Sequence, residues 1–325
     1  MRFLSFVLAL YFVCCSTSLC LAGSVINRVK ARGVVCCGGS ERPGLAFEDA
    51  RGHWKGLEVD VCRAVADAVL GSPDRIQFHG YVTPKGFDTA RKQKDDICFL
   101  TGTEIANHQM AGKVLPGLTV FVESQNVMVT TNSSVRHLAG LAGDSICYMT
   151  GSPAEQSLDA YFAGIHKHFS HRAFSEFGEM NDTYRVQNCH ALAGDITYLA
   201  SVRLNPGINH ISSRILPESL ATYPVLAATP VLDAKWSAIV AWTVDTLISA
   251  ERPETKWSNT GAAAMPVVAP ELGLAKGWQT RVLQAVGNYR DIFARNLGTK
   301  SPLKLECGFN ANQVNGGLLL APFLQ

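Results

Sequence analysis

Short apolar segments alternate with amphipathic segments through the first third of the chain. In residues 57–70 the apolar positions recur every three or four residues, which predicts a helix. Asp60 stands in its first turn, and Gly71 with Pro73 is typical of a helix end. Helices alternating with short apolar strands predict βαβ units around a parallel sheet. By the same reasoning we expect a helix running into a strand at 25–35, a glycine-bearing loop at 36–40, strands at 75–78 and 97–100, and a helix at 87–94.

The alternation restarts after residue 125, which predicts a second α/β module inserted into the first. Its expected strands are 126–130, 145–149, 171–174 and 191–194, and its expected helices are 153–163 and 179–187. A return strand is expected at 225–228, followed by helical segments at 236–250 and 278–295.

The N-terminal segment has the pattern of a secretory signal peptide. Arg2 precedes an apolar run over residues 3–15, and Cys20 and Ala22 are small residues three and one positions before a cut after Ala22. The run is too short to span a bilayer, which takes about 20 residues. We therefore expect residues 1–22 to be removed and the remaining chain to be exported into an oxidising compartment, where cysteines normally pair.

Composition and charge exclude several other classes of protein. Hydrophobic residues make up 47% of the chain, enough for a full core. Lys and Arg number 29 against 27 Asp and Glu, and the basic residues are not clustered, so no nucleic-acid partner is expected. His166, His168 and His171 suggest a metal site, but a solvated helix-to-strand connection explains them better. We expect neither a metal nor another cofactor.

Several segments resemble the amino-acid-binding proteins of ABC importers. Residues 56–66, GLEVDVCRAVA, look like the family's G-L-D-V-D-F-C-R-A-V-A, and residues 145–152, SICYMTGS, are similar to its S-I-C-V-Q-T-G-T. Residues 286–296, VGNYRDIFARN, resemble the C-terminal V-G-N-Y-G-E-I-F-E-R-N. The resemblance runs from about residue 25 to the C-terminus, is looser over 252–270, and is strongest to the broad-specificity L-amino-acid subgroup.

The resemblance implies an α/β fold of the two-lobed periplasmic binding protein type (type II), in which parallel-sheet lobes are joined by two crossing segments. We place the crossings near 121–126 and 216–222. Lobe 1 would then comprise residues 23–122 and 223–325, and lobe 2 residues 123–222. A hinge would close the lobes on a small ligand. The expected partner is an inner-membrane ABC permease, the expected location is the periplasm, and the expected state is a monomer.

The same resemblance implies one disulfide in each lobe. Cys37 would pair with Cys62, and Cys147 with Cys189. Cys36, Cys98 and Cys307 are left over, and their state stays open.

Part of the family's ligand site is kept. Such proteins grip the α-carboxylate of an amino acid with an Arg and the ammonium with an Asp. Backbone N–H groups at Thr150, Gly151 and Ser152, ahead of the helix expected at 153, would add donors for the carboxylate. The ammonium acid falls on Asp195.

The first lobe departs from the family pattern in residues 99–109, FLTGTEIANHQ. The carboxylate Arg falls on His108 and an aromatic residue falls on Glu104, whereas Thr103 keeps its type. His108 cannot make a two-pronged guanidinium contact, and Glu104 would add negative charge where a carboxylate should bind. We therefore expect an altered specificity, for an amine-bearing or cationic ligand without a clamped α-carboxylate.

Two alternatives stay open beside this reading. The chain could be a degenerate paralogue that serves as a sensor or surface antigen instead of in transport. It could also be a dehydratase-like enzyme on the same fold, with Glu104 as general acid and His108 as its partner. No matching catalytic motif is present, so we expect a binding protein and not an enzyme.

Overall fold

The computed structural model describes residues 24–81, 86–205, 207, 210–231, 233–252 and 270–322. The predicted signal peptide, residues 1–22, lies outside these ranges, as does most of the looser stretch 252–270. Within the described ranges, no helix combines the length and the apolar character needed to cross a bilayer.

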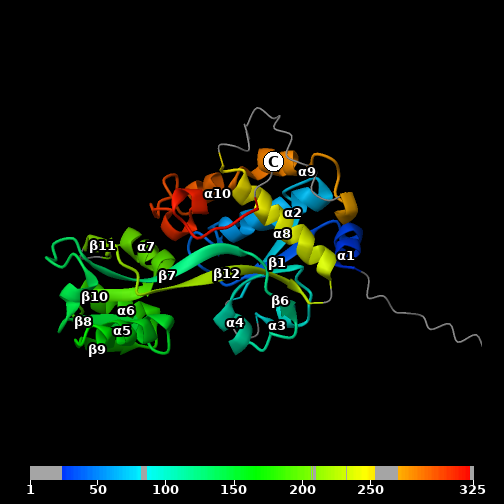
Figure 1. Cartoon of the computed structure of the whole chain (residues 1–325). Helices are drawn as coiled ribbons and strands as arrows, with labels where there is room; N and C mark the ends of the chain where they lie inside the picture. Colours follow the sequence, from blue (N-terminus) through cyan, green and yellow to red (C-terminus); the bar gives the residue numbers. More distant parts are fainter. Residues whose placement is uncertain are drawn as a thin grey trace, which may run out of the picture.

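One mixed sheet extends from one end of the molecule to the other (Figure 1). Its strands occur in the order β4 (Ile76–Gly80), β1 (Val35–Gly39), β5 (Ile97–Thr101), β12 (Ala221–Pro230), β7 (Thr119–Thr130), β10 (Ala191–Asp195), β8 (Ser145–Met149) and β9 (Ser170–Phe174). The short strands β6 (Val114–Leu115) and β11 (Ser213–Ile215) pair with β12 and β7, and β2 (Phe47–Glu48) forms a hairpin with β3 (Trp54–Lys55).

Helices cover both ends of this sheet. They are α1 (Val25–Arg32), α2 (Leu57–Leu70), α3 (Asp88–Arg91), α4 (Gly102–Asn107), α5 (Pro153–Gly164), α6 (Phe177–Arg185), α7 (Ile196–Leu204), α8 (Ala234–Ser249), α9 (Trp278–Val286) and α10 (Tyr289–Asn296). As predicted, α2 carries Asp60 in its first turn and ends at Gly71 with φ 71°. Helices α4 and α7, which follow β5 and β10, were not predicted.

Two long strands connect the two ends of the molecule. In Figure 1, β7 and β12 run side by side from the β1 end to the β10 end. They are antiparallel, with Phe121 opposite Val225 and Gln125 opposite Ala221. The first predicted crossing, 121–126, lies within β7. Of the second predicted crossing, 216–222, only the last two residues lie on β12, which begins at Ala221.

The buried side chains form separate cores at the two ends. The larger core packs α2, α8, α9 and α10 onto the β1 end of the sheet and includes Val65 and Leu247. Another core packs α5 against β8 and β10 and includes Ile146 and Leu158. Each end therefore has a hydrophobic core of its own, which is the architecture of a two-lobed α/β protein.

Both predicted disulfides are present in the structure. Cys37 of β1 is bonded to Cys62 of α2, with Cα atoms 6.3 Å apart. Cys147 of β8 is bonded to Cys189, just before β10, with Cα atoms 5.8 Å apart. Cys36, Cys98 and Cys307 are free thiols, of which the first two are buried.

The predicted loop at 36–40 is wrong, because Cys36–Gly39 belong to β1. Gly38 pairs with His79 of β4 on one side and with Cys98 of β5 on the other. The ring of Tyr81 lies so close to Gly38 that any Cβ there would overlap the phenol. The glycine thus makes room for a neighbouring side chain within a strand.

Candidate functional site

One group of polar side chains lies at the N-terminus of α4, at the end of β5, and we call it the first wall of the candidate site. Thr101 caps this helix, and its hydroxyl accepts a hydrogen bond from the Glu104 N–H at 3.1 Å. In return, Glu104 Oε2 accepts from the Thr101 N–H at 2.7 Å. This reciprocal capping box fixes the Glu104 carboxylate at the end of the helix.

Arg42, in the loop after β1, binds the same carboxylate. Its Nη2 lies 2.7 Å from Glu104 Oε1, and Ser40 Oγ donates to that oxygen as well. Burial alone would raise the pKa of Glu104, but Arg42, Ser40 and the Thr101 N–H outweigh it and hold that pKa below its usual range. The sequence predicts added negative charge at Glu104. The carboxylate is ionised, as that prediction requires, and Arg42 is its ion-pair partner.

Glu58, the second residue of α2, lies on the other side of Arg42. Its Oε1 is 3.5 Å from Arg42 Nη1, and its side chain is fully buried. Neither carboxyl oxygen has a hydrogen-bond partner within the described residues. The carboxyl lies against Gly39, where any Cβ would overlap Oε2. Burial raises the pKa of Glu58 to about 8, although Arg42 opposes the shift.

The second wall lies where β7, β10 and β12 meet. Asp195, the last residue of β10, accepts a hydrogen bond from Tyr223 Oη at 2.6 Å and another from Gln125 Nε2. Glu123 of β7 is buried and accepts from Thr197 Oγ1 at 2.7 Å. Burial and the Asp195 charge raise the pKa of Glu123 to about 8.

The two walls belong to one electrostatic neighbourhood. Burial alone would lower the pKa of Arg42, but the charges of the surrounding acidic groups outweigh it and raise that pKa; these groups are Glu104, Glu58, Tyr223 and Glu123. Arg42 is paired with Glu104, whereas Glu58 and Glu123, whose pKa values are raised to about 8, are largely protonated at neutral pH. The hydrogen-bond partners of Asp195 are the neutral side chains of Tyr223 and Gln125, so its carboxylate favours a ligand that carries positive charge.

In the second lobe, the predicted backbone donors already have partners. The Thr150 N–H donates to Phe174 O at 2.8 Å, and the Ser152 N–H donates to Met149 O at 3.2 Å. The Gly151 N–H donates to Glu155 Oε2 at 2.6 Å. In this structure none of the three N–H groups is therefore free for a ligand carboxylate.

The remaining predicted residues lie along α4. Thr103 is exposed in its first turn, and His108 is the C-cap at the opposite end of the helix from Glu104. The His108 ring stacks on Phe87, with centroids 3.7 Å apart. Because Arg42, Ser40 and Thr101 hold Glu104 as an anion, it lacks the raised pKa of a general acid, which weakens the dehydratase hypothesis.

Sequence reasoning missed several residues of this neighbourhood. Arg42 lies 62 positions from Glu104, and Tyr223 lies 28 positions from Asp195. Only the strand order brings these pairs together. One signal was available, because Glu58 lies within residues 56–66, a segment that resembles the family.

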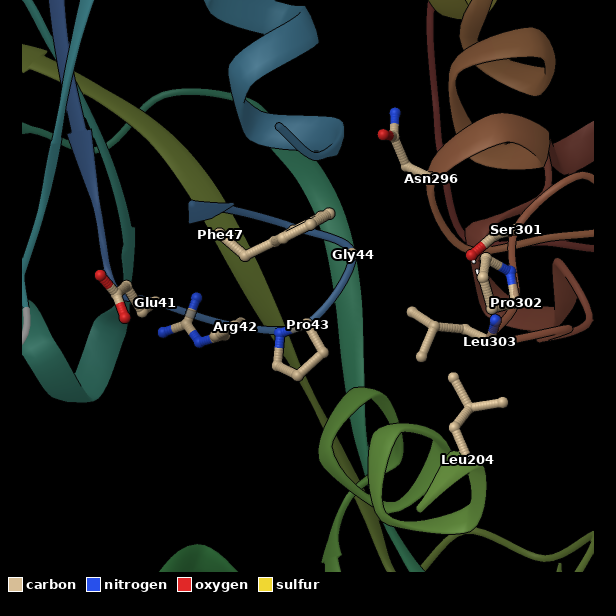
Figure 2. A pocket seen from close by; sticks show the side chains of 10 residues that line it. All are labelled: Glu41, Arg42, Pro43, Gly44, Phe47, Leu204, Asn296, Ser301, Pro302 and Leu303. Carbon is tan, nitrogen blue, oxygen red and sulfur yellow. Dashed lines mark hydrogen bonds between the residues drawn. The ribbon is translucent and has the colours of Figure 1, made fainter. Parts of the chain in front are cut away.

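A pocket of about 420 Å³ adjoins the Arg42 loop (Figure 2). In Figure 2 the Arg42 side chain points away from the apolar end of this pocket, where Leu204 of α7 faces Leu303. The Arg42 guanidinium thus serves the carboxyl cluster and not this apolar pocket.

The histidine-rich connection lies beside a second pocket. His166, His168 and His171 line a pocket of about 380 Å³ together with Asp159. In the part of the chain that the structure describes, no three His, Cys, Asp or Glu side chains are grouped closely enough to hold a metal ion.

Comparisons with known proteins agree with this architecture. No model of a known protein family matches the chain. The general L-amino acid-binding periplasmic protein AapJ of Rhizobium johnstonii is 31% identical over 320 residues, which cover 93% of each chain. The glutamate/glutamine/aspartate/asparagine-binding protein BztA of Rhodobacter capsulatus is 28% identical over 325 residues, again 93% of each.

A solved structure shares both the fold and the sequence pattern. It is an ABC transporter periplasmic binding protein from Brucella ovis with glutathione bound, which superposes with a TM-score of 0.73 at 30% identity. The match covers 91% of this chain and 98% of that one. The fold, the lobe-to-lobe strands and these relatives lead to one conclusion: the chain belongs to the family of periplasmic amino-acid-binding proteins of ABC transporters.

Proposed function

We propose that this protein captures a small amine-bearing ligand between its two lobes, without gripping an α-carboxylate, and hands it to an ABC permease. As a solute-binding protein of an amino-acid ABC transporter, it works in the periplasm. We further propose that lobe 1 comprises residues 23–122 and 223–325 and lobe 2 residues 123–222. The separate hydrophobic cores support this division, and β7 and β12 would act as the hinge.

The charge balance of the two walls carries the proposal for the ligand. Asp195 supplies the acid that the family uses for an ammonium group, and its Oδ1 accepts hydrogen bonds from Tyr223 and Gln125. The one guanidinium of the cluster, that of Arg42, is already paired with Glu104. The site therefore offers the Asp195 carboxylate for an amine, and its guanidinium is not free for a carboxylate.

The names of two relatives bear on the proposed ligand. AapJ is named for L-amino acids, and the Brucella ovis protein holds glutathione, so both recognise molecules that contain carboxylates. In this chain His108 stands at the position expected for the carboxylate-binding Arg, and its ring is stacked on Phe87. We propose that specificity has shifted away from the carboxylate within a conserved scaffold.

Calorimetry with two matched ligands tests this proposal. L-lysine and 1,5-diaminopentane differ only by the α-carboxylate, so their affinities isolate its contribution. We expect the diamine to bind at least about tenfold more tightly than lysine at pH 7.5, a difference of about 1.4 kcal/mol. We also expect diamine binding to weaken as the pH falls through about 8, because Glu58 and Glu123, whose pKa values are about 8, then lose their negative charge.

Two results would oppose the proposal. Tight binding of a neutral amino acid such as L-glutamine at pH 7.5 would show that the carboxylate is still gripped. Amino-acid binding that strengthens as the pH falls would indicate that a protonated His108 holds the carboxylate instead. If neither an amine nor an amino acid binds, the degenerate paralogue becomes the better account.

A further inference from the structure

We infer that Glu104 acts as an internal substitute for a ligand carboxylate and is thereby the residue that sets specificity in the first lobe. Its side chain occupies the carboxylate-binding groups of that lobe, so a ligand carboxylate has no receptor. This inference rests on the proposed function, because it explains how the same site would select amines.

The groups around Glu104 form a complete carboxylate receptor. Oε1 accepts hydrogen bonds from Arg42 Nη2 and Ser40 Oγ. Oε2 accepts from the Thr101 N–H at 2.7 Å and from Thr101 Oγ1 at 3.0 Å. A guanidinium, hydroxyls and a backbone N–H are the donors that proteins use for a bound carboxylate. Here each of these groups donates to the protein's own Glu104, the guanidinium through Nη2.

Arg42 has little freedom to serve a second carboxylate. Its side chain is 11% exposed and is enclosed between Glu104 and the buried Glu58. The loop that carries it is closed by hydrogen bonds of 2.9 and 3.1 Å between the backbones of Arg42, Ala46 and Leu45. The guanidinium therefore stays with Glu104 unless that carboxylate is removed.

An incoming amino acid would meet a cost that an amine avoids. Its carboxylate would have to displace Glu104 from Arg42, which would leave two carboxylate anions close to one guanidinium. Like charges at this distance in a partly buried wall repel. A ligand with ammonium groups alone leaves the Arg42–Glu104 pair intact and gains the attraction of Asp195.

Removing the internal carboxylate should therefore restore amino-acid recognition. We expect E104A to bind L-lysine at least tenfold more tightly than the unsubstituted protein does, and to bind 1,5-diaminopentane several-fold more weakly. E104Q keeps an acceptor for the Thr101 N–H, so it preserves the helix cap while removing the charge. It should shift both affinities in the same directions by a smaller factor.

Two further variants make the readout specific. E48Q removes an acid from the exposed hairpin strand β2, and it should leave both affinities unchanged. Adding R42Q to E104A should abolish the gain in lysine binding, because the freed guanidinium is then missing. All affinities are measured by calorimetry, and thermal unfolding checks that each variant is folded.

The ligand preference of the unsubstituted protein tests the proposed function. The change in affinity caused by E104A and E104Q tests this inference. If lysine binding does not rise in either folded variant, the inference is overturned, even where the diamine still binds to the unsubstituted protein. If E104A does not fold, the E104Q result decides alone. A gain in lysine binding that persists with R42Q would also contradict the inference, because Arg42 would not be the receptor.

Discussion

Between pH 5.5 and pH 8, ionisation of Glu58 is expected to cost the unsubstituted protein about 3 kcal/mol of folding stability. Replacing Glu58 with glutamine should abolish this loss. Glu58 is fully buried beside Gly39, and neither carboxyl oxygen has a hydrogen-bond partner within the described residues. Burial raises its pKa to about 8, against about 4.3 for an exposed glutamic acid. The folded chain therefore holds a proton that the unfolded chain has released.

The direction of the effect follows from proton linkage. A carboxyl whose pKa is raised on folding contributes stability that is full below its unfolded pKa. This stability is lost progressively as the pH rises toward the folded pKa. The loss is about 1.4 kcal/mol for each pH unit between the two values. Glu123, whose pKa is also raised to about 8, acts in the same direction and remains in the E58Q protein.

Urea unfolding at several pH values measures this effect. The unsubstituted protein should lose stability steadily above pH 5.5, and E58Q should have a flatter profile. E48Q is the matched control, because it removes an exposed acid from β2 and should leave the profile as it was. Parallel profiles for E58Q and the unsubstituted protein would mean that Glu58 is ionised in the folded state.

Replacing Asp195 with asparagine should weaken the binding of 1,5-diaminopentane by about 30-fold or more. Losing one partner of a charge-assisted contact in a desolvated site costs about 2–5 kcal/mol. Asp195 receives hydrogen bonds from Tyr223 and Gln125, which fix its carboxylate at the end of β10. Asparagine keeps the size and one acceptor oxygen but not the charge.

Calorimetry of D195N should be compared with D159N. Asp159 lies on α5 with a side chain that is 55% exposed, near His171, so its replacement removes an acid from lobe 2 outside the proposed site. D159N should bind the diamine as the unsubstituted protein does. An affinity for D195N within threefold of the unsubstituted value would exclude Asp195 as the ammonium partner.

Much of the fold follows from local patterns in the sequence. The alternation of apolar and polar positions identifies β8, α5 and α8 almost to the residue, because each combines a clear period with a recognisable start or end. The strand at Cys36–Gly39 was missed because glycines normally weaken strands. Its glycines are explained only by Tyr81 and Glu58, which approach from elsewhere in the chain.

The candidate site could be predicted only in part, because some of its contacts join residues far apart in the sequence. Asp195 could be placed by resemblance, and Glu104 could be recognised as a departure from the family pattern. The hydrogen-bond partners of Glu104 could not be predicted, because Arg42 and Ser40 reach it across the sheet and not along the chain. Local sequence shows which side chains are present, whereas pairing between distant strands decides which of them neutralise one another.

The most direct test of the central claim is to identify the ligand that the native protein retains. The full-length protein should be exported and purified without denaturation, and its mass should be measured before and after release of the bound molecule. The account predicts a small compound with at least one amine and no α-carboxylate. A neutral or acidic amino acid recovered in stoichiometric amount would contradict it.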